Sequence, residues 1–312
     1  MKTPLYIDTD AGTDDAVALI MALRHPAIEV KGISCVGGNV SLDHVVQNVL
    51  YLVEECQSKV TVHVGAAQPM KRVLETADFI HGSDGMGDIG LKLSGRKPDS
   101  YNAVNHIIQT ARELDGTLQF ICLGPMTNLA HTIEQYPEIE DLIDHLYIMG
   151  GLYRMPGNVT PVSEYNLWAD PEAAKICINS KIDKTVIGWD ITLTDGYLTV
   201  DEVDELREYP TPLAKVAADI QNIKLQWLQD NEQDVVCYLP DPLAMAAVID
   251  PEIITQHGSY HCDVVCSGDM DDTRGMLIVD VNGIKKKRVN TRLVHQASHE
   301  RFKEVLFNAF KS

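Results

Sequence analysis

The chain has 312 residues, a net charge of −19 and a pI of about 4.8. A protein this acidic is poorly suited to binding nucleic acid or an anionic membrane, so we expect neither as a partner. No apolar run reaches the ~18 residues of a membrane span, and the first residues do not resemble a secretory signal. The seven scattered cysteines favour reduced thiols, and we expect a cytoplasmic protein.

Strand and helix patterns alternate along the chain. Strand patterns occupy residues 5–7, 30–36, 60–64, 118–123, 146–149 and 184–189. Helical spacing is found at 16–23, 42–55, 103–114, 126–136, 171–179, 201–208, 212–229, 242–248 and 298–310. Residues 259–290 are rich in strand formers, and their charge runs, Asp269–Asp272 and Lys285–Arg288, are interpreted as solvated hairpin tips. This order predicts one α/β domain over residues 1–312, with an open, Rossmann-like, mostly parallel central sheet flanked by helices.

The densest group of acidic residues follows the first strand directly. Asp8, Asp10, Asp14 and Asp15 fall within eight residues, and Gly12 between them permits a tight turn into the next helix. Carboxylates this close repel one another unless a cation neutralises them, and clustered oxygen ligands favour Ca²⁺ or Mg²⁺. The stretch lacks the closing Glu of an EF-hand loop, so that interpretation is rejected. We predict a metal or catalytic site here rather than a solvated acidic loop.

Polar residues also follow the later strands. Each such segment alone is explained by turn chemistry, but open α/β sheets bind ligands at the carboxyl ends of their strands. We therefore expect these segments to converge on one site. They are Asn39, Leu123–Asn128, Met149–Gly151, Gly157–Asn166 and Asp241–Ala244.

The same segments carry a family resemblance. Asp-Thr-Asp-x-Gly-x-Asp-Asp at 8–15 is followed in order by Gly-Gly-Asn, Leu-Gly-Pro-Met-Thr-Asn, Met-Gly-Gly, Gly-Asn-x-Thr-Pro-x-x-Glu-x-Asn, Asp-Pro-Glu-Ala-Ala and Asp-Pro-Leu-Ala. This series resembles the inosine–uridine nucleoside N-ribohydrolase family over nearly the whole chain. The resemblance implies Ca²⁺-dependent hydrolysis of the N-glycosidic bond of ribonucleosides by a homodimer or homotetramer.

The resemblance also assigns roles to individual residues. It implies that Asp10 takes a proton from a Ca²⁺-bound water. The implied metal ligands are the side chains of Asp10, Asp15 and Asp241 and the backbone carbonyl of Leu123. The implied ribose contacts are Asp14 and Asn166 for the 2′- and 3′-hydroxyls, Asn158 and Glu164 for the 5′-hydroxyl, and Asn39 and Met149 along the sugar pocket.

The chain departs from the family pattern at Pro240. Many members have a His before the late metal-binding Asp, and this His helps to protonate the departing base. Proline cannot do so, which leaves purine or pyrimidine preference open. The candidates to replace it are His81, Tyr165, Trp168, Trp227 and Tyr238. We predict His81, in a glycine-rich loop, as the catalytic acid, although a loop-stabilising hydrogen bond would also explain it.

Two other functions remain open from the sequence. Because of Pro240, the chain could be a Ca²⁺-dependent nucleoside-binding protein that has lost turnover. The Asp-x-Asp pattern also suits a phosphatase with Asp8 as its nucleophile. That second interpretation gives no role to the segment from Asn158 to Asn166.

Overall fold

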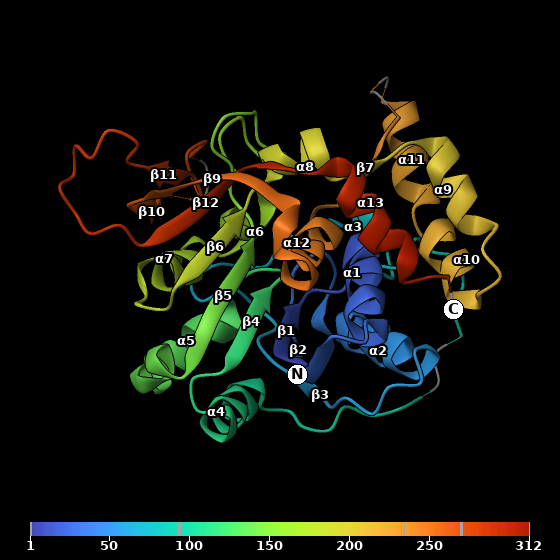
Figure 1. The fold of residues 1–312 in the computed structure, drawn as a ribbon, viewed down its shortest axis with the longest axis horizontal. Helices are drawn as coiled ribbons and strands as arrows, with labels where there is room; N and C mark the ends of the chain where they lie inside the picture. Colours follow the sequence, from blue (N-terminus) through green and yellow to red (C-terminus); the bar gives the residue numbers. More distant parts are fainter. Residues whose placement is uncertain (1, 93–94, 232, 234, 269–270, 312) are drawn as a thin grey trace.

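The structure is a computed structural model that describes residues 2–92, 95–231, 233, 235–268 and 271–311. Its centre is an eight-stranded sheet in the order β3-β2-β1-β4-β5-β6-β12-β9 (Figure 1). Every neighbouring pair in this sheet is parallel except β12–β9. The predicted class, a mostly parallel sheet flanked by helices, is confirmed.

The strands are short, and two further ribbons lie outside the main sheet. The main sheet contains β1 (Thr3–Thr9), β2 (Ile28–Cys35), β3 (Val62–Val64), β4 (Leu118–Cys122), β5 (Ile143–Met149), β6 (Lys184–Ile187), β9 (Ile254–Tyr260) and β12 (Thr291–Ala297). The ribbons pair β7 (Tyr197–Leu198) with β8 (Cys237–Tyr238), and β10 (Cys262–Val264) with β11 (Leu277–Val279).

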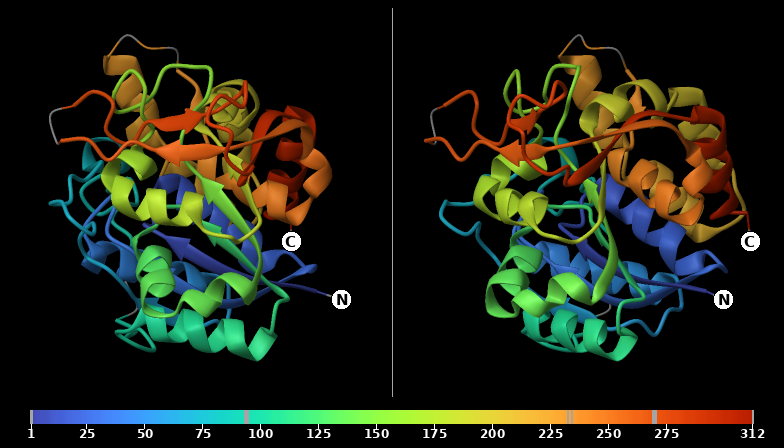
Figure 2. Two further views of the ribbon diagram at one scale, coloured as in Figure 1. Left: turned by 90° about the vertical axis from the view of Figure 1, so that its left-hand side faces the viewer. Right: turned by 60° about the vertical axis from the view of Figure 1, so that its left-hand side comes forward.

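Helices cover both faces of the sheet (Figure 2). One face carries α1 (Thr13–Arg24), α2 (Leu42–Glu55), α12 (Pro240–Ile249) and α13 (His299–Asn308). The other carries α4 (Ala103–Leu114), α5 (Thr127–Gln135) and α7 (Pro171–Asn179). The remaining helices are α3 (Asp78–His81), α6 (Tyr165–Ala169), α8 (Trp189–Asp195), α9 (Val200–Arg207), α10 (Pro212–Asp219) and α11 (Asn222–Asp230), with 3₁₀ turns at Pro137–Asp141 and Pro251–Ile253.

This arrangement produces two apolar cores, one on each face. Side chains alternate along β1, so Leu5 and Ile7 pack with α1 and α12, while Tyr6 packs on the opposite side. Tyr6 stacks there on Phe120 of β4, with ring centroids 5.2 Å apart. Because both faces are covered, the carboxyl-terminal parts of β1, β2, β4 and β5 are buried on both sides rather than in alternation.

Two predicted segments differ from the structure. The single helix expected at 212–229 is interrupted between α10 and α11, where the buried Gln221 donates its amide to the carbonyl of Thr13 at 2.9 Å. Neither Gly nor Pro marks this break, so the helical spacing did not predict it. Among the described residues of the β-rich stretch at 259–290, the strands are β10, β11 and the end of β9, and residues 280–290 form an irregular loop.

The two charge runs also have different surroundings. Asp271 and Asp272 are exposed in the connection between the paired strands β10 and β11, as a hairpin tip requires, and residues 269–270 lie outside the described part of the chain. Lys285–Arg288 is exposed, but it joins β11 to β12, which belong to different sheets. The hairpin interpretation of this second run was therefore wrong.

The strand order fixes where a ligand can bind. β1 has β2 on one side and β4 on the other, so the direction of winding reverses between β1 and β4. Open α/β sheets bind ligands in the crevice at the carboxyl ends of the strands at such a reversal. Here these ends lead into Asp10 and Leu123. Among the described helices, none has the length and apolar content to cross a bilayer.

Candidate active site and metal centre

The turn between β1 and α1 holds Asp15 rigidly. Thr9 donates its hydroxyl to Asp15 Oδ1 at 2.5 Å, and the backbone N–H of Gly12 donates to Oδ2 at 2.8 Å. Ala11 between them has φ of 39°, a left-handed conformation that residues with a Cβ rarely adopt. The predicted strand–turn–helix is confirmed, and its turn is strained where strain often accompanies function.

Asp241 reaches the same place from the far end of the sequence. Pro240 occupies the first position of α12, where proline is favourable, and Asp241 lies in the first turn near the positive end of the helix dipole. α12 packs against α1. Carboxylate oxygens of Asp14, Asp15 and Asp241 lie within 4.8 Å of one another, and all three residues are buried.

Asp10 lies beside these three carboxylates. Its side chain occupies a space that exists because Gly38 and Gly124 have no Cβ. Its Oδ2 accepts the backbone N–H of Asn39 at 2.8 Å, and its Oδ1 has no partner. A Cβ on Gly124 would lie 2.6 Å from that Oδ1, and a Cβ on Gly38 would overlap with Oδ2. The site therefore keeps one oxygen of Asp10 uncommitted.

The charges in this group destabilise one another. Burial, and then the charge of Asp15, raise the pKa of Asp10 well above its usual range. Burial followed by Asp14 raises the pKa of Asp15 to about 6, and burial followed by Asp15 raises the pKa of Asp241. Oδ1 of Asp14, like that of Asp10, is buried without a partner. A hard divalent cation fits this site, because all the donors are oxygens and two of them lack a partner.

Asn166 organises the backbone at the ends of β4 and β5. Its side-chain amide donates to the carbonyl of Leu123 at 2.7 Å and to that of Met149 at 3.1 Å. A carbonyl oxygen has two lone pairs, so Leu123 can still accept a second partner. Asn39 donates its own amide to Asp15 Oδ2 at 3.1 Å. The structure thus brings Asn166, Leu123, Met149 and Asn39 together around the acidic group.

Glu164 and Asn158 shape the start of α6. The buried carboxylate of Glu164 accepts the backbone N–H of Asn166 at 2.9 Å and that of Gly151 at 2.8 Å. Burial raises the pKa of Glu164 to about 7. Asn158 is exposed and accepts the backbone N–H of Tyr165 at 3.0 Å. Contact of either side chain with a 5′-hydroxyl stays a prediction.

His81 ends the short helix α3 and is buried against the turn. Its Nδ1 accepts the backbone N–H of Thr13 at 3.1 Å and lies 3.7 Å from Oδ1 of Asp14. Burial lowers the pKa of His81 to about 4. The imidazole is therefore neutral near pH 7, with Nδ1 as an acceptor and its proton on Nε2.

The aromatic candidates have other partners. Tyr165 donates its hydroxyl to the carbonyl of Glu75 at 2.8 Å. The ring of Trp168 lies under the guanidinium of Arg274 at 3.9 Å. Two more pairs are Trp227 with Phe79, at 5.8 Å between ring centroids, and Tyr238 with Trp189, at 5.7 Å. Of the predicted acids, His81 is the one that the structure joins to the acidic turn, through its hydrogen bond with Thr13.

Two buried amides at the site escaped the sequence interpretation. Asn48 of α2 donates to the carbonyl of Ala11 at 3.1 Å and to that of Asp84 at 2.8 Å, and so connects the turn to the glycine-rich loop. Gln221 supports the start of α1 through Thr13. A polar residue within the apolar stripe at 42–55 was a signal for Asn48. Nothing comparable marked Gln221.

Asp8 lies on the opposite face of β1 from Ile7 and has structural partners. It accepts the hydroxyl of Ser34 and the amide of Asn128, the latter at 2.8 Å, and burial raises its pKa to about 7. The residue is 1% exposed. Asp8 is not among the carboxylates that the fold gathers at the acidic centre, which are Asp14, Asp15 and Asp241, so the structure lends the phosphatase interpretation no support.

An open α/β sheet with an acidic, all-oxygen centre at its winding reversal defines an enzyme of the α/β class with a site built for a metal. Comparison with known proteins refines this assignment. The profile of the inosine-uridine preferring nucleoside hydrolases matches residues 5–304. A pyrimidine-specific ribonucleoside hydrolase, RihB of Escherichia coli, is 32% identical over 292 residues, which cover 94% of this chain and 92% of that protein.

Solved structures agree. A plant nucleoside hydrolase, the PpNRh1 enzyme, superposes with a TM-score of 0.92 at 28% identity, covering 100% of both chains. A purine-preferring ribonucleoside hydrolase from Gardnerella vaginalis gives 0.91 at 30% identity, covering 99% of this chain and 98% of its own. The chain belongs to the inosine-uridine preferring nucleoside hydrolase family, whose members are N-ribohydrolases.

Proposed function

We propose that this protein hydrolyses the N-glycosidic bond of ribonucleosides in a Ca²⁺-dependent reaction, with Asp10 as the general base. The observation that carries the proposal is the unpartnered Oδ1 of Asp10 beside the buried carboxylates of Asp14, Asp15 and Asp241. A base must have an oxygen free to receive a proton, and a buried acidic group of this kind requires a cation.

Asp15, Asp241, Asp10 and the carbonyl of Leu123 are the proposed ligands of Ca²⁺. When bound, Ca²⁺ would polarise and orient a water molecule and the sugar hydroxyls. Asp10 receives the proton of the attacking water on Oδ1, while its Oδ2 stays fixed by Asn39. The glycines at 38 and 124 keep the carboxylate from being displaced.

The ribose is held by residues on the rim of the acidic group. Asp14 has one unpartnered oxygen for a sugar hydroxyl, and Asn166 is oriented by Glu164 and the strand ends. Several hydrogen bonds to one sugar supply binding energy that can distort the ring toward the oxocarbenium-like transition state. Asn39 and Met149 complete the proposed sugar pocket, with Asn158 and Glu164 toward the 5′-hydroxyl.

His81 is the proposed partner of the leaving base. Its neutral ring presents Nε2–H as a donor, because Nδ1 is occupied by Thr13. Donation to a ring nitrogen or carbonyl oxygen of the base would stabilise the charge that develops on departure. The related proteins include a pyrimidine-specific and a purine-preferring enzyme at similar identity, so they favour neither class of base for this chain.

The test is a substrate panel. Inosine, adenosine, guanosine, uridine and cytidine are incubated with the protein after chelator treatment, with and without added Ca²⁺, and released ribose is measured. Ca²⁺-dependent release from at least one nucleoside is expected, and its loss in Asp10→Asn and Asp241→Asn. Asp271→Asn, at an exposed residue, is the matched control.

Other outcomes of this panel would favour a competing function or contradict the assignment of Ca²⁺. Nucleoside binding without ribose release would favour the binding protein that Pro240 suggested. Full activity in chelator would contradict the assignment of Ca²⁺. The proposal also includes a homodimer or homotetramer, which light scattering would measure. It includes a cytoplasmic location as well, which the seven free cysteines support.

A further inference from the structure

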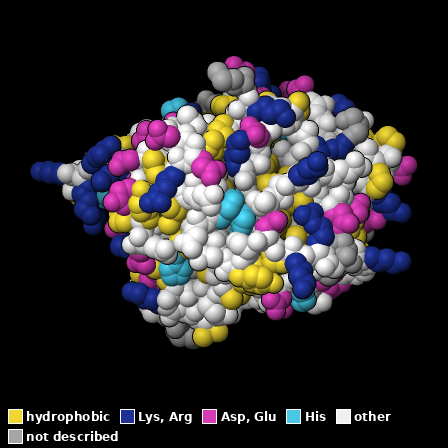
Figure 3. Space-filling model, turned by 90° about the horizontal axis from the view of Figure 1, so that it is seen from below, with side chains coloured by type: hydrophobic (Ala, Val, Ile, Leu, Met, Phe, Trp, Pro, Cys, Tyr) yellow, Lys and Arg dark blue, Asp and Glu magenta, His cyan; other side chains and the backbone are white. Residues whose placement is uncertain are grey.

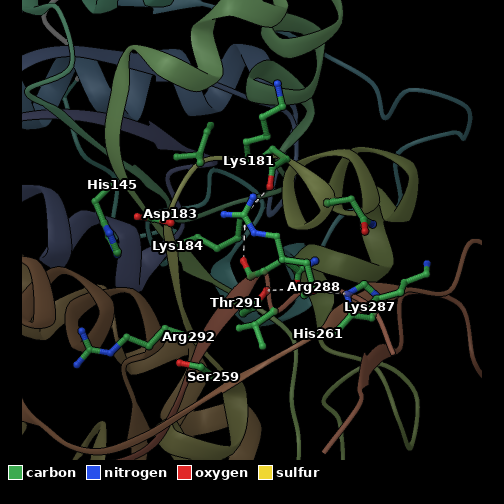
Figure 4. A pocket seen from close by; sticks show the side chains of 15 residues that line it. His145, Lys181, Asp183, Lys184, Ser259, His261, Lys287, Arg288, Thr291 and Arg292 are labelled. Atoms are coloured by element: carbon green, nitrogen blue, oxygen red, sulfur yellow. Dashed lines mark hydrogen bonds between the residues drawn. The ribbon is translucent and has the colours of Figure 1, made fainter. Parts of the chain in front are cut away.

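A pocket separate from the acidic centre lies at the opposite end of the strands of the sheet. Its volume is about 660 Å³, which is the size of a small-molecule site. It forms where β6 and β12 begin and β9 ends, and the loop at 280–290 closes one side (Figure 4). The acidic centre lies at the carboxyl ends of β1 and β4, so the two sites are separated by the length of the strands.

Cationic side chains dominate this pocket. Lys181, Lys184, Lys287, Arg288 and Arg292 line it with His145 and His261, and Asp183 is the one carboxylate among the lining residues. They come from four separate parts of the sequence, and Figure 4 shows them arranged around one space, with His145 and Arg292 on one side and Lys287 and His261 on the other. Seen from below, Lys and Arg side chains gather at the left end of the molecule, where Figure 1 places the loop between β11 and β12 (Figure 3).

These cations lack acidic partners. Within the described residues, no ion pair is formed by any of the five Lys and Arg side chains of the pocket. The whole chain carries a net charge of −19, so carboxylates to pair with them are abundant elsewhere. A convergence of unpaired cations on one cavity of an acidic protein is what a bound anion requires.

Lys184 is the central residue of the pocket. It is only 3% exposed, and its ammonium donates to the carbonyls of Ser180 at 3.0 Å and Asn290 at 3.2 Å. An ammonium has three N–H groups, so one remains for a ligand. Burial lowers the pKa of Lys184 to about 8, although nearby acidic groups, Asp183 and Glu140 among them, act in the opposite direction. Nε of Arg292 is likewise buried without a partner.

We propose that this pocket is a binding site for a small phosphate-bearing anion. Phosphate oxygens accept hydrogen bonds from Lys and Arg, and several cations suit a doubly charged group better than a single carboxylate. The volume accommodates inorganic phosphate, pyrophosphate or a sugar phosphate. Nucleic acid is disfavoured because the rest of the surface is strongly acidic.

The experiment measures binding by isothermal titration calorimetry on the metal-loaded protein, with inorganic phosphate, pyrophosphate and ribose 5-phosphate as probes and ribose as the neutral comparison. The test variant is Lys287→Gln/Arg288→Gln. Its matched control is Lys285→Gln/Lys286→Gln, which removes two charges from the same exposed loop at positions that do not line the pocket.

The phosphate-bearing probes are expected to bind and ribose is not. The pocket pair should lose about tenfold in affinity or more, equivalent to about 1.4 kcal/mol, and the control pair less than about twofold. Arg292→Gln should show the same loss of affinity. Because Arg292 lies in β12, this variant keeps the test valid if the loop substitutions disturb the folding of the loop itself. The probe with the largest difference between pocket and control variants identifies the kind of ligand.

Four results would overturn the proposal. The first three are absence of binding by every probe, equal weakening in the pocket and control pairs, and a fall in molecular mass of the pocket variants by light scattering. The third result would assign these cations to a contact between subunits. Binding that survives in the pocket variants would belong to the acidic centre and its metal instead, so it too counts against this site.

Discussion

Nδ1 of His81 accepts the backbone N–H of Thr13 at 3.1 Å, although 68 positions separate the two residues. This bond fixes the ring beside the acidic turn and leaves Nε2–H as its free donor. His81→Ala should therefore lower kcat for inosine and uridine by about 10²–10³-fold, the usual cost of removing one hydrogen-bond donor that stabilises developing negative charge. Activity on p-nitrophenyl riboside should change little, because nitrophenolate departs without a proton.

Steady-state kinetics on the three substrates decides between the two roles of this residue. Equal loss on all of them would mean that His81 acts only by supporting the turn. His131→Ala, at a residue whose side chain is 42% exposed, serves as the comparison.

Gly124 must stay without a side chain for Asp10 to keep its position. A Cβ there would lie 2.6 Å from Oδ1 of Asp10. Gly124→Ala should lower kcat by about 10²-fold, because a displacement on the order of 1 Å in a reacting group has that effect. Gly268→Ala adds the same methyl where no atom lies within 4 Å, and its kcat should match the parent. An unchanged kcat in Gly124→Ala would contradict the placement of Asp10 as the base.

Metal binding should stabilise the fold, because the buried carboxylates of Asp15 and Asp241 repel each other without it. At a Ca²⁺ concentration of about 100 times Kd, the gain in unfolding free energy should be about 2.7 kcal/mol. Thermal unfolding with chelator and with Ca²⁺ measures it. Asp241→Asn should abolish the Ca²⁺-dependent rise in Tm. A Tm independent of Ca²⁺ in the parent would remove the metal centre from the proposal.

Stability at acid pH should depend on His63, which stacks on His106 with ring centroids 3.5 Å apart. Burial, and then the charge of His106, lower the pKa of His63 to about 4 from the ordinary 6.5. Between these pH values the unfolded chain binds a proton that the folded one does not, so this contribution to stability falls as pH drops from about 6.5 to about 4.

The measurement is Tm against pH for the parent and for His63→Gln. The parent should lose more Tm than the variant over this window. Asp8 and Glu164, whose raised pKa values give the opposite slope, are present in both proteins and cancel in the difference. Parallel curves would show that His63 is not the group responsible.

The ribose 2′-hydroxyl should be required for turnover. A site whose polar groups hydrogen-bond a hydroxyl rejects the analogue without it, in favourable cases by about 10⁴–10⁵-fold in kcat/KM. Asp14 and Asn166 are the residues proposed to make this contact. Comparing uridine with 2′-deoxyuridine, and inosine with 2′-deoxyinosine, checks it. Equal turnover of either pair would remove that role from both residues.

The sequence was sufficient for six of the eight strands of the central sheet and for the residues at their ends, but β12 and most of β9 lie outside the predicted strands. The carboxylates at 8–15 lie close together in the sequence, so a local pattern was enough to find them, whereas the role of Asp241 came from the family resemblance. Contacts between segments that are distant in the chain could not be predicted from the sequence. Gln221 contacts Thr13 across 208 positions of sequence. Lys287 and Arg288 are exposed, as predicted, but the sequence could not show that the fold places them on one pocket with Lys184.

One amide has a practical consequence for anyone who alters base preference. The glycine-rich loop that carries His81 is fastened through the carbonyl of Asp84 to Asn48, and the same amide holds Ala11 in its left-handed conformation. A loop transplanted from a relative without a matching helix α2 would release that anchor and allow Ala11 to relax. A loop exchange should therefore include the residue on α2 that holds the loop, Asn48, so that both change together.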